Sequence, residues 1–213
     1  NLLGSVRDPD FQVSVNLAPS RQMDLMLSMS HIPTRVAPSG FSATETVALP
    51  GGIWPAQALA ALLRPIGVTL DAAAFRLPLP AGKLAEASAS LPAGEGPMLV
   101  LAPAGGPADW PAARWQELPA RIRSSLPALR ALELAPATPA IAAQRAAQVA
   151  AADVVLASDP LTIELALLSG TPLVALGRPA ATLPARSGVS GCGEAGSLPG
   201  LALDSVLQAL GLG

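Results

Sequence analysis

The residues of this chain best suited to chemistry lie at the turn Ser158-Asp159-Pro160. Ser158 or Asp159 can accept a hydrogen bond from an unpaired amide at the start of a helix. Pro160 suits the first turn of that helix, because no amide donor is needed there. The free amides and the dipole at a helix start favour an anionic ligand such as a phosphate. The turn therefore predicts an anion-binding position.

A strand, a helix and a second strand are expected around this turn. Residues 153–156 (DVVL) form a short apolar run that is typical of a strand buried on both faces. Leucines then recur at helical spacing, at Leu161, Leu165 and Leu168. Gly170 supplies a left-handed helix stop, and residues 172–176 begin another strand. This pattern predicts a βαβ unit, in which ligands bind at the carboxyl ends of the parallel strands.

The residues before this unit also alternate between strand and helix. Residues 98–102 (MLVLA) predict a buried strand, and Gly105 and Gly106 lie in the tight loop that follows it. Pro111 suits the first turn of a helix that runs to about Ser124. Further elements are expected as a strand at 129–134 and helices at 140–151 and 201–210. The alternation predicts an α/β fold with parallel sheets flanked by helices.

The N-terminal part of the chain alternates in the same way. A strand is expected at 11–17, a helix at 21–30, a short strand at 32–37 and a helix at 54–63. We expect a partial N-terminal Rossmann-like domain at 1–80, a linker rich in proline and glycine at 81–97, and a second Rossmann-like domain at 98–213. The chain begins with Asn1 and not with Met, so we expect that its first domain lacks earlier strands.

Composition excludes several classes of protein. Hydrophobic residues make up 51% of the 213 positions and charged residues 13%, with a net charge of −2, which argues against disorder. The lysines and arginines are scattered, so nucleic acid is not an expected partner. A single cysteine, Cys192, excludes an internal disulfide and any cysteine-based zinc site, and suggests the cytoplasm. Proline or polar residues interrupt each apolar stretch, so no transmembrane helix is expected.

Two segments carry a family resemblance. MLVLAPAGGPADWPAARWQELPARI (98–122), followed by DVVLASDPLTIELALLSGTPLVALG (153–177), resembles the C-terminal half of family 9 glycosyltransferases, the lipopolysaccharide heptosyltransferase-like group. Residues 11–70 resemble the later part of the N-terminal domain of that family. The resemblance implies the GT-B fold, with two Rossmann-like domains. It also implies inverting transfer of a hexose or heptose from a nucleotide-sugar donor to a glycan or glycolipid acceptor, without a required metal or cofactor.

The resemblance also implies the donor-binding residues. They occupy the loops after the two buried strands: Ala104, Gly105, Gly106, Ser158, Asp159, Pro160, Leu161, Thr162 and Glu164. The first loop departs from the His-Pro-Gly pattern of the family at Ala102, and Ala108-Asp109 stands where a lysine usually precedes Trp110-Pro111. In the second loop, Leu161 and Glu164 replace the glycine and the histidine of Asp-Thr-Gly-Pro-Met-His.

Several of these residues have a structural interpretation beside the functional one. Asp159 could cap a helix without any ligand, and Glu164 could favour the helix dipole or point to solvent. Gly105 and Gly106 could form an ordinary strand-to-helix turn. Trp110 and Trp115 most simply pack their helix onto the sheet, although Trp110 could border a cleft. Two other reactive side chains are expected to have no catalytic role: His31 as a structural or surface residue and Cys192 as a free thiol in a loop.

Three functions remain open at this point. The first is a fragment of a cytoplasmic glycosyltransferase that builds a surface polysaccharide or lipid-linked glycan, with a peripheral position at the inner membrane face as an option. The catalytic base of that family is an aspartate in the first N-terminal loop, a region that we expect to be missing here, so no residue is assigned to this role. The second is a non-catalytic homologue that binds a nucleotide, a glycan or a protein partner. The third is a sugar-nucleotide epimerase of similar fold, for which no acid–base residues are found.

Overall fold

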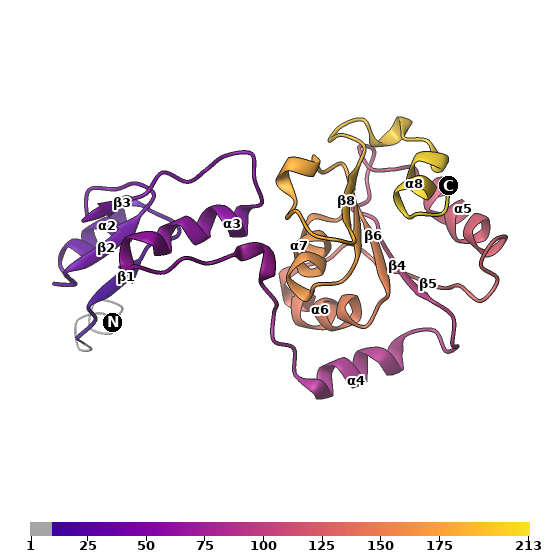
Figure 1. Cartoon of the computed structure of the whole chain (residues 1–213), viewed down its shortest axis with the longest axis horizontal. Coiled ribbons are helices and arrows are strands. Elements are labelled where there is room, and N and C mark those ends of the chain that lie inside the picture. Colours follow the sequence, from indigo (N-terminus) through magenta and orange to yellow (C-terminus); the bar gives the residue numbers. More distant parts are fainter. Residues whose placement is uncertain (1–9) are drawn as a thin grey trace. The chain divides into compact units, whose positions relative to one another are not determined.

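The computed structural model describes residues 10–213. They belong to two units, Asn1–Ala74 and Phe75–Gly213, which are described separately. Each unit contains a parallel sheet with helices in its connections (Figure 1). The expected α/β fold with parallel sheets flanked by helices is confirmed.

A five-stranded sheet forms the centre of the second unit. All its neighbouring strands are parallel, and their order is β5-β4-β6-β7-β8. The strands are β4 (Met98–Ala102), β5 (Arg130–Glu133), β6 (Val154–Ala157), β7 (Leu173–Leu176) and β8 (Val189–Cys192). The chain first runs outward from β4 to β5, then returns past β4 to β6 and continues to β7 and β8. The direction of the strand order therefore reverses between β4 and β6, where α/β sheets bind their ligands.

Helices pack on both faces of this sheet. The helices of the unit are α4 (Ala81–Ser90), α5 (Ala112–Arg123), α6 (Ala142–Ala150), α7 (Pro160–Ser169) and α8 (Leu203–Ala209). Helices α5 and α8 contact each other and share one apolar cluster with alternate β4 residues such as Leu99 and Leu101. Helices α6 and α7 pack together, and α4 packs on α6. Every β4 residue is buried, which explains why the sequence of this strand is a continuous apolar run.

The first unit holds a smaller sheet. Its strands are parallel in the order β1-β2-β3, and Val13 of β1 is paired with Thr34 of β2. Its elements are β1 (Val13–Val15), α2 (Arg21–Ser28), β2 (Thr34–Ala37), β3 (Glu45–Thr46) and α3 (Pro55–Ala60). Short 3₁₀ helices complete the chain at Ala61–Ile66, Ala72–Ala74, Pro139–Ile141, Ala180–Thr182 and Leu198–Gly200. His31 is exposed and has a left-handed backbone, with φ of 61°.

The structure differs from the sequence-based expectation in three places. The helix expected at 54–63 is α3 continued by a 3₁₀ turn, and Pro65 lies inside that turn. Strands β3 and β8 were not expected from the sequence, and β8 includes Cys192, which was expected in a loop. The linker was expected at 81–97, where the sequence also offered a helix at 83–90; this segment contains α4, and the two units divide after Ala74.

Candidate functional site

A pocket of about 260 Å³ opens at the carboxyl ends of three neighbouring strands, β4, β6 and β7. Its wall includes Ala104, Ser158 and Arg178, one from the loop after each strand, together with Leu198 from a later segment. The pocket lies beside the reversal of strand order, where an open parallel sheet binds its ligand. Three larger hollows lie away from these loops. Two are lined by helix surfaces, next to α5 and α8 and between α4 and α6, and the third lies at the amino ends of β7 and β8.

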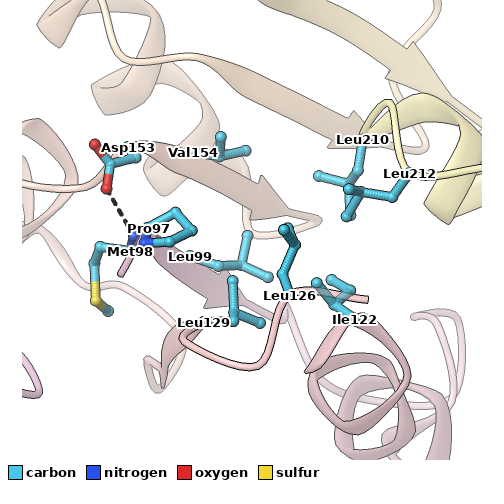
Figure 2. Close-up of a pocket in the computed structure, with 10 residues that line it drawn as sticks. All are labelled: Pro97, Met98, Leu99, Ile122, Leu126, Leu129, Asp153, Val154, Leu210 and Leu212. Carbon is cyan, nitrogen blue, oxygen red and sulfur yellow. Dashed lines mark hydrogen bonds between the residues drawn. The ribbon is translucent and has the colours of Figure 1, made fainter. Parts of the chain in front are cut away.

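A second pocket, of about 130 Å³, lies at the opposite, amino edge of the sheet (Figure 2). Half of its lining residues are leucines, among them Leu126 and Leu210. Asp153 is its one charged lining residue, and the Oδ2 of this residue accepts the N–H of Met98 at 2.7 Å. The carboxyl-edge pocket is therefore the better candidate for a polar ligand.

The loop after β4 is held by side-chain acceptors. The N–H of Ala104 donates to Ser158 Oγ at 2.8 Å, which joins this loop to the loop after β6. The N–H of Gly105 donates to Asp109 Oδ2 at 2.8 Å, and the N–H of Trp110 donates to Asp109 Oδ1 at 2.7 Å. Gly105 has a φ of 77°, a conformation that glycine adopts without strain. Asp109 thus accepts two backbone amides of this loop.

Asp159 caps helix α7. Its Oδ2 accepts hydrogen bonds from the N–H of Thr162 at 2.7 Å and from Thr162 Oγ1 at 2.5 Å. Its Oδ1 accepts the N–H of Ala137 at 3.3 Å, which fastens the loop after β5 to the start of α7. Only 5% of Asp159 is exposed. The structural interpretation of this residue as a helix cap is confirmed, and its contact with a donor remains a prediction.

Arg145 of α6 joins the start of α7 to the loop after β5, and the sequence analysis missed this residue. The residue is 3% exposed and donates to Thr162 Oγ1 at 2.8 Å and to the carbonyl oxygen of Ala135 at 2.6 Å. Burial lowers the pKa of Arg145, and the negative charge of Asp159 opposes this effect. The available sequence signal was a lone arginine in an alanine-rich helix, which is weak because such residues commonly face solvent.

Glu164 forms an ion pair with Arg178. Glu164 Oε1 and Arg178 Nη2 are 2.9 Å apart. The side chain of Glu164 is 32% exposed, and that of Arg178 is 24% exposed. Arg178 lines the pocket, while Glu164 lies on the second turn of α7. The sequence analysis missed Arg178, although it follows Gly177 directly after a buried strand. That position is the signal that could have identified it, because carboxyl ends of parallel strands converge on the site.

The structure brings together most of the predicted donor-binding residues. Those that line the pocket are Ala104, Gly105, Ser158 and Pro160. Thr162 is fully buried, Gly106 lies in the loop after β4, and Leu161 lies in the first turn of α7. Their contact with a donor stays a prediction.

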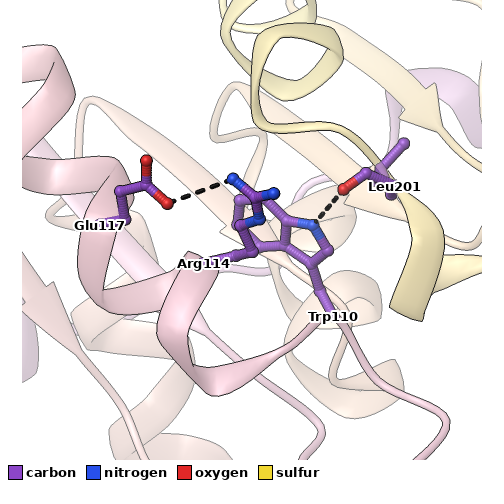
Figure 3. A network of polar contacts seen from close by, with 4 residues as sticks. All are labelled: Trp110, Arg114, Glu117 and Leu201. Atoms are coloured by element: carbon purple, nitrogen blue, oxygen red, sulfur yellow. Dashed lines mark hydrogen bonds and ion pairs between the residues drawn. The ribbon is translucent and has the colours of Figure 1, made fainter.

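Trp110 packs inside the fold. It is 1% exposed, and its Nε1 donates to the carbonyl oxygen of Leu201 at 2.9 Å (Figure 3). On the exposed side of α5, Arg114 and Glu117 form an ion pair at 3.2 Å, also drawn in Figure 3. The packing interpretation of Trp110 is thus confirmed. The bond to Leu201 also fixes the segment that carries Leu198 into the wall of the pocket.

Two further properties concern the residues 10–213 that the structure describes. Within this range no helix is long and apolar enough to span a bilayer. The same residues contain no cluster of three or more histidine, cysteine, aspartate or glutamate side chains suited to a metal ion.

Comparisons with known proteins define the class of fold. The chain is similar to the structure of E. coli ADP-heptose LPS heptosyltransferase II, with a TM-score of 0.70 and 19% identity over 99% of this chain and 78% of that one. It is also similar to a family 9 glycosyl transferase from Veillonella parvula, with a TM-score of 0.76 and 13% identity over 99% and 76% of the two chains. The chain therefore has the GT-B-like α/β fold of these glycosyltransferases. A scan against family models and a search of curated proteins found no match.

Proposed function

We propose that this chain is a divergent member of glycosyltransferase family 9 that moves a hexose or heptose from a nucleotide-sugar donor to a glycan acceptor. One observation carries the proposal. A pocket opens at the carboxyl ends of β4, β6 and β7, beside the reversal of strand order, in a chain that matches glycosyltransferase structures over 99% of its length. Sheets of this kind place nucleotides at that point.

The chemistry of sugar transfer explains what such a pocket must provide. Transfer breaks the bond between the sugar and the nucleoside diphosphate, so negative charge grows on the departing phosphate in the transition state. Fixed dipoles or cations near that phosphate lower the barrier, and a base elsewhere accepts the proton of the acceptor hydroxyl. The start of α7 and Arg178 are suited to the first task. We assign the second task to no residue of this chain.

The finer features of the proposal rest on the resemblance to family 9. They are inversion at the sugar carbon, transfer without a required metal, and an acceptor of the lipopolysaccharide type or another surface glycan or glycolipid. A cytoplasmic location, with a peripheral position at the inner membrane face, belongs to the same proposal because nucleotide sugars and lipid-linked acceptors meet there.

A thermal-shift screen of the purified chain against ADP-, GDP- and UDP-linked sugars tests the proposal. A ligand at a hundredfold excess over its Kd stabilises the folded chain by about 2.7 kcal/mol, which raises the Tm by about 5 to 10 °C. We expect one nucleotide series to produce such a shift. Failure of all three series would contradict the proposal.

A matched pair of variants locates the binding. Ala108 lines the pocket, whereas Ala113 is exposed on α5 and does not. Ala108→Trp should fill the entrance and abolish the shift, and Ala113→Trp should leave it unchanged. An equal shift in both variants would place the nucleotide outside this pocket.

A second candidate is a non-catalytic homologue that binds a glycan or a protein partner. The observation in its favour is that Ser158 and Asp109 accept the N–H groups of Ala104 and Gly105, so these amides are already satisfied. This candidate predicts no shift with any nucleotide sugar, which the same screen distinguishes.

A further inference from the structure

Several backbone donors in the loops after β4 and β6, beside the carboxyl-edge pocket, already have an acceptor. The N–H groups of Ala104 and Gly105 donate to Ser158 and Asp109, as described above. At the start of α7, Pro160 has no N–H, and the N–H groups of Thr162 and Ile163 donate to the side chain and the carbonyl oxygen of Asp159, which leaves the N–H of Leu161 in this turn. A phosphate that enters at this turn therefore replaces only part of its hydration with backbone donors of these two loops, and a charged side chain should contribute.

Arg178 is the cation in the described wall of this pocket. Its guanidinium has five N–H donors, and the bond to Glu164 uses one of them. The planar fork of an arginine matches two phosphate oxygens at once and stays charged at all physiological pH values. The side chain is 24% exposed, so it is accessible to a ligand and yet held by its partner.

We propose that Arg178 contacts the diphosphate of the donor, in competition with Glu164, which holds the guanidinium when the pocket is empty. The inference rests on the proposed function, because it assigns the phosphate contact within that site. Glu164 weakens the binding of the ligand, because its carboxylate lies beside the cation and repels an entering phosphate. Loss of Arg178 should thus weaken diphosphate binding, and neutralisation of Glu164 should strengthen it.

Calorimetric titration with three probes measures this contact: inorganic pyrophosphate, the nucleoside diphosphate of the series selected in the screen, and the corresponding nucleoside. For Arg178→Gln, we expect the Kd of both diphosphate probes to rise about tenfold or more. For Arg178→Lys, which keeps the charge but not the fork, we expect an intermediate loss. For Glu164→Gln, the Kd should fall by about two- to fivefold, a gain that misfolding cannot produce. Nucleoside binding should change in none of them.

A second ion pair of the chain provides the control. Arg114 and Glu117 lie at 3.2 Å on the exposed side of α5, outside the pocket (Figure 3). Arg114→Gln and Glu117→Gln remove the same charges from the chain, and we expect them to leave the diphosphate Kd unchanged. A loss in Arg114→Gln equal to that in Arg178→Gln would show a general effect of charge and overturn the inference.

The outcomes separate the two proposals. If nucleotide sugars bind the pocket and Arg178→Gln binds them as tightly as the unaltered chain, the inference is wrong and the proposed function stands. If pyrophosphate binds in an Arg178-dependent way but no nucleotide sugar binds, the contact of Arg178 with a diphosphate stands, but its assignment to a sugar donor and the proposed function are wrong. If neither probe binds, both are wrong. A weaker affinity in Glu164→Gln would overturn the competition.

Discussion

Trp110 and Trp115 meet edge to face, with ring centroids 5.2 Å apart and planes at 79°, but only one of the two indole N–H groups is satisfied. Trp110 donates to the carbonyl oxygen of Leu201, whereas the buried Nε1 of Trp115 has no acceptor within residues 10–213. A buried unsatisfied donor costs about 1 to 3 kcal/mol, and a satisfied one contributes about 1 kcal/mol. The two tryptophans therefore make opposite polar contributions to stability.

This difference predicts unequal effects of the same substitution. Trp110→Phe loses the bond and leaves the Leu201 carbonyl oxygen without this donor, whereas Trp115→Phe removes an unsatisfied group. We expect Trp110→Phe to lower the free energy of unfolding by about 1 to 3 kcal/mol more than Trp115→Phe. Urea unfolding followed by far-UV circular dichroism measures both. Equal losses would mean that ring volume alone determines the cost.

Removal of the α7 cap should be the most costly loss of a carboxylate. Asp159→Ala deletes the acceptor of Thr162 and Ala137 and removes the negative charge near buried Arg145. We expect a loss of about 2 to 4 kcal/mol, and a smaller loss for Asp159→Asn, which keeps an acceptor. Asp153→Ala, which removes only the bond to the Met98 N–H, should cost about 1 kcal/mol. Chemical denaturation that ranks Asp153→Ala as the costlier change would contradict this account.

Two glycines should respond oppositely to alanine. A Cβ at Gly191 of β8 would lie 2.2 Å from the backbone carbonyl oxygen of Arg178, so β8 or the turn that carries Arg178 must move. We expect Gly191→Ala to cost about 1 to 3 kcal/mol. A Cβ at Gly82 of α4 meets nothing within 4 Å, and Gly82→Ala should stabilise the helix by about 0.5 kcal/mol. Melting temperatures that move in the same direction would disprove the pair of predictions.

The thiol of Cys192 should titrate at a higher pH in the folded chain than in the unfolded chain, because burial raises its pKa. A raised pKa favours the neutral thiol in the folded state. Its contribution to stability is therefore complete below the unfolded pKa and is lost as the pH rises through the folded pKa. We expect the free energy of unfolding to fall more steeply above about pH 8.5 in the unaltered chain than in Cys192→Ala.

The rate of alkylation by iodoacetamide provides a second measurement of the same thiol. Its pH profile should have a higher midpoint in the native chain than in guanidinium, because the thiolate is the reactive form. Coincident midpoints would show that the environment of Cys192 in β8 does not affect its titration.

The sequence predicted those elements whose side chains alone determine them. Strand β4 was located by five consecutive apolar residues, and α7 by its Asp159 cap, its leucine spacing and Gly170, which has a φ of 80°. Strand β8 (VSGC) escaped detection because it has one β-branched residue and a central glycine. It is a strand because it pairs with β7, and the intrinsic strand propensity of a segment does not predict its pairing with another segment.

The candidate site was predictable to a similar extent. The βαβ pattern placed Ser158 and Asp159 at the carboxyl edge, because parallel strands end together. Arg145 and Arg178 were not identified, since each acts on a residue of another element: Arg145 on Thr162 and Arg178 on Glu164. The direction of a long side chain depends on how helices cross the sheet, which one sequence does not specify.

The strand order of the second unit has a consequence for synthesis of the chain on the ribosome. Strand β4 lies between β5 and β6, and Met98 is bound to Asp153, 55 positions later. Until β6 emerges, the edge of β4 that pairs with β6 is unpaired, and the loop after β4 lacks its hydrogen-bond partner Ser158. Parallel pairing over such distances is slow and leaves apolar edges open to other nascent chains. We therefore expect the pocket to be among the last parts of the unit to form, and nascent chains halted before β6 to depend on chaperones.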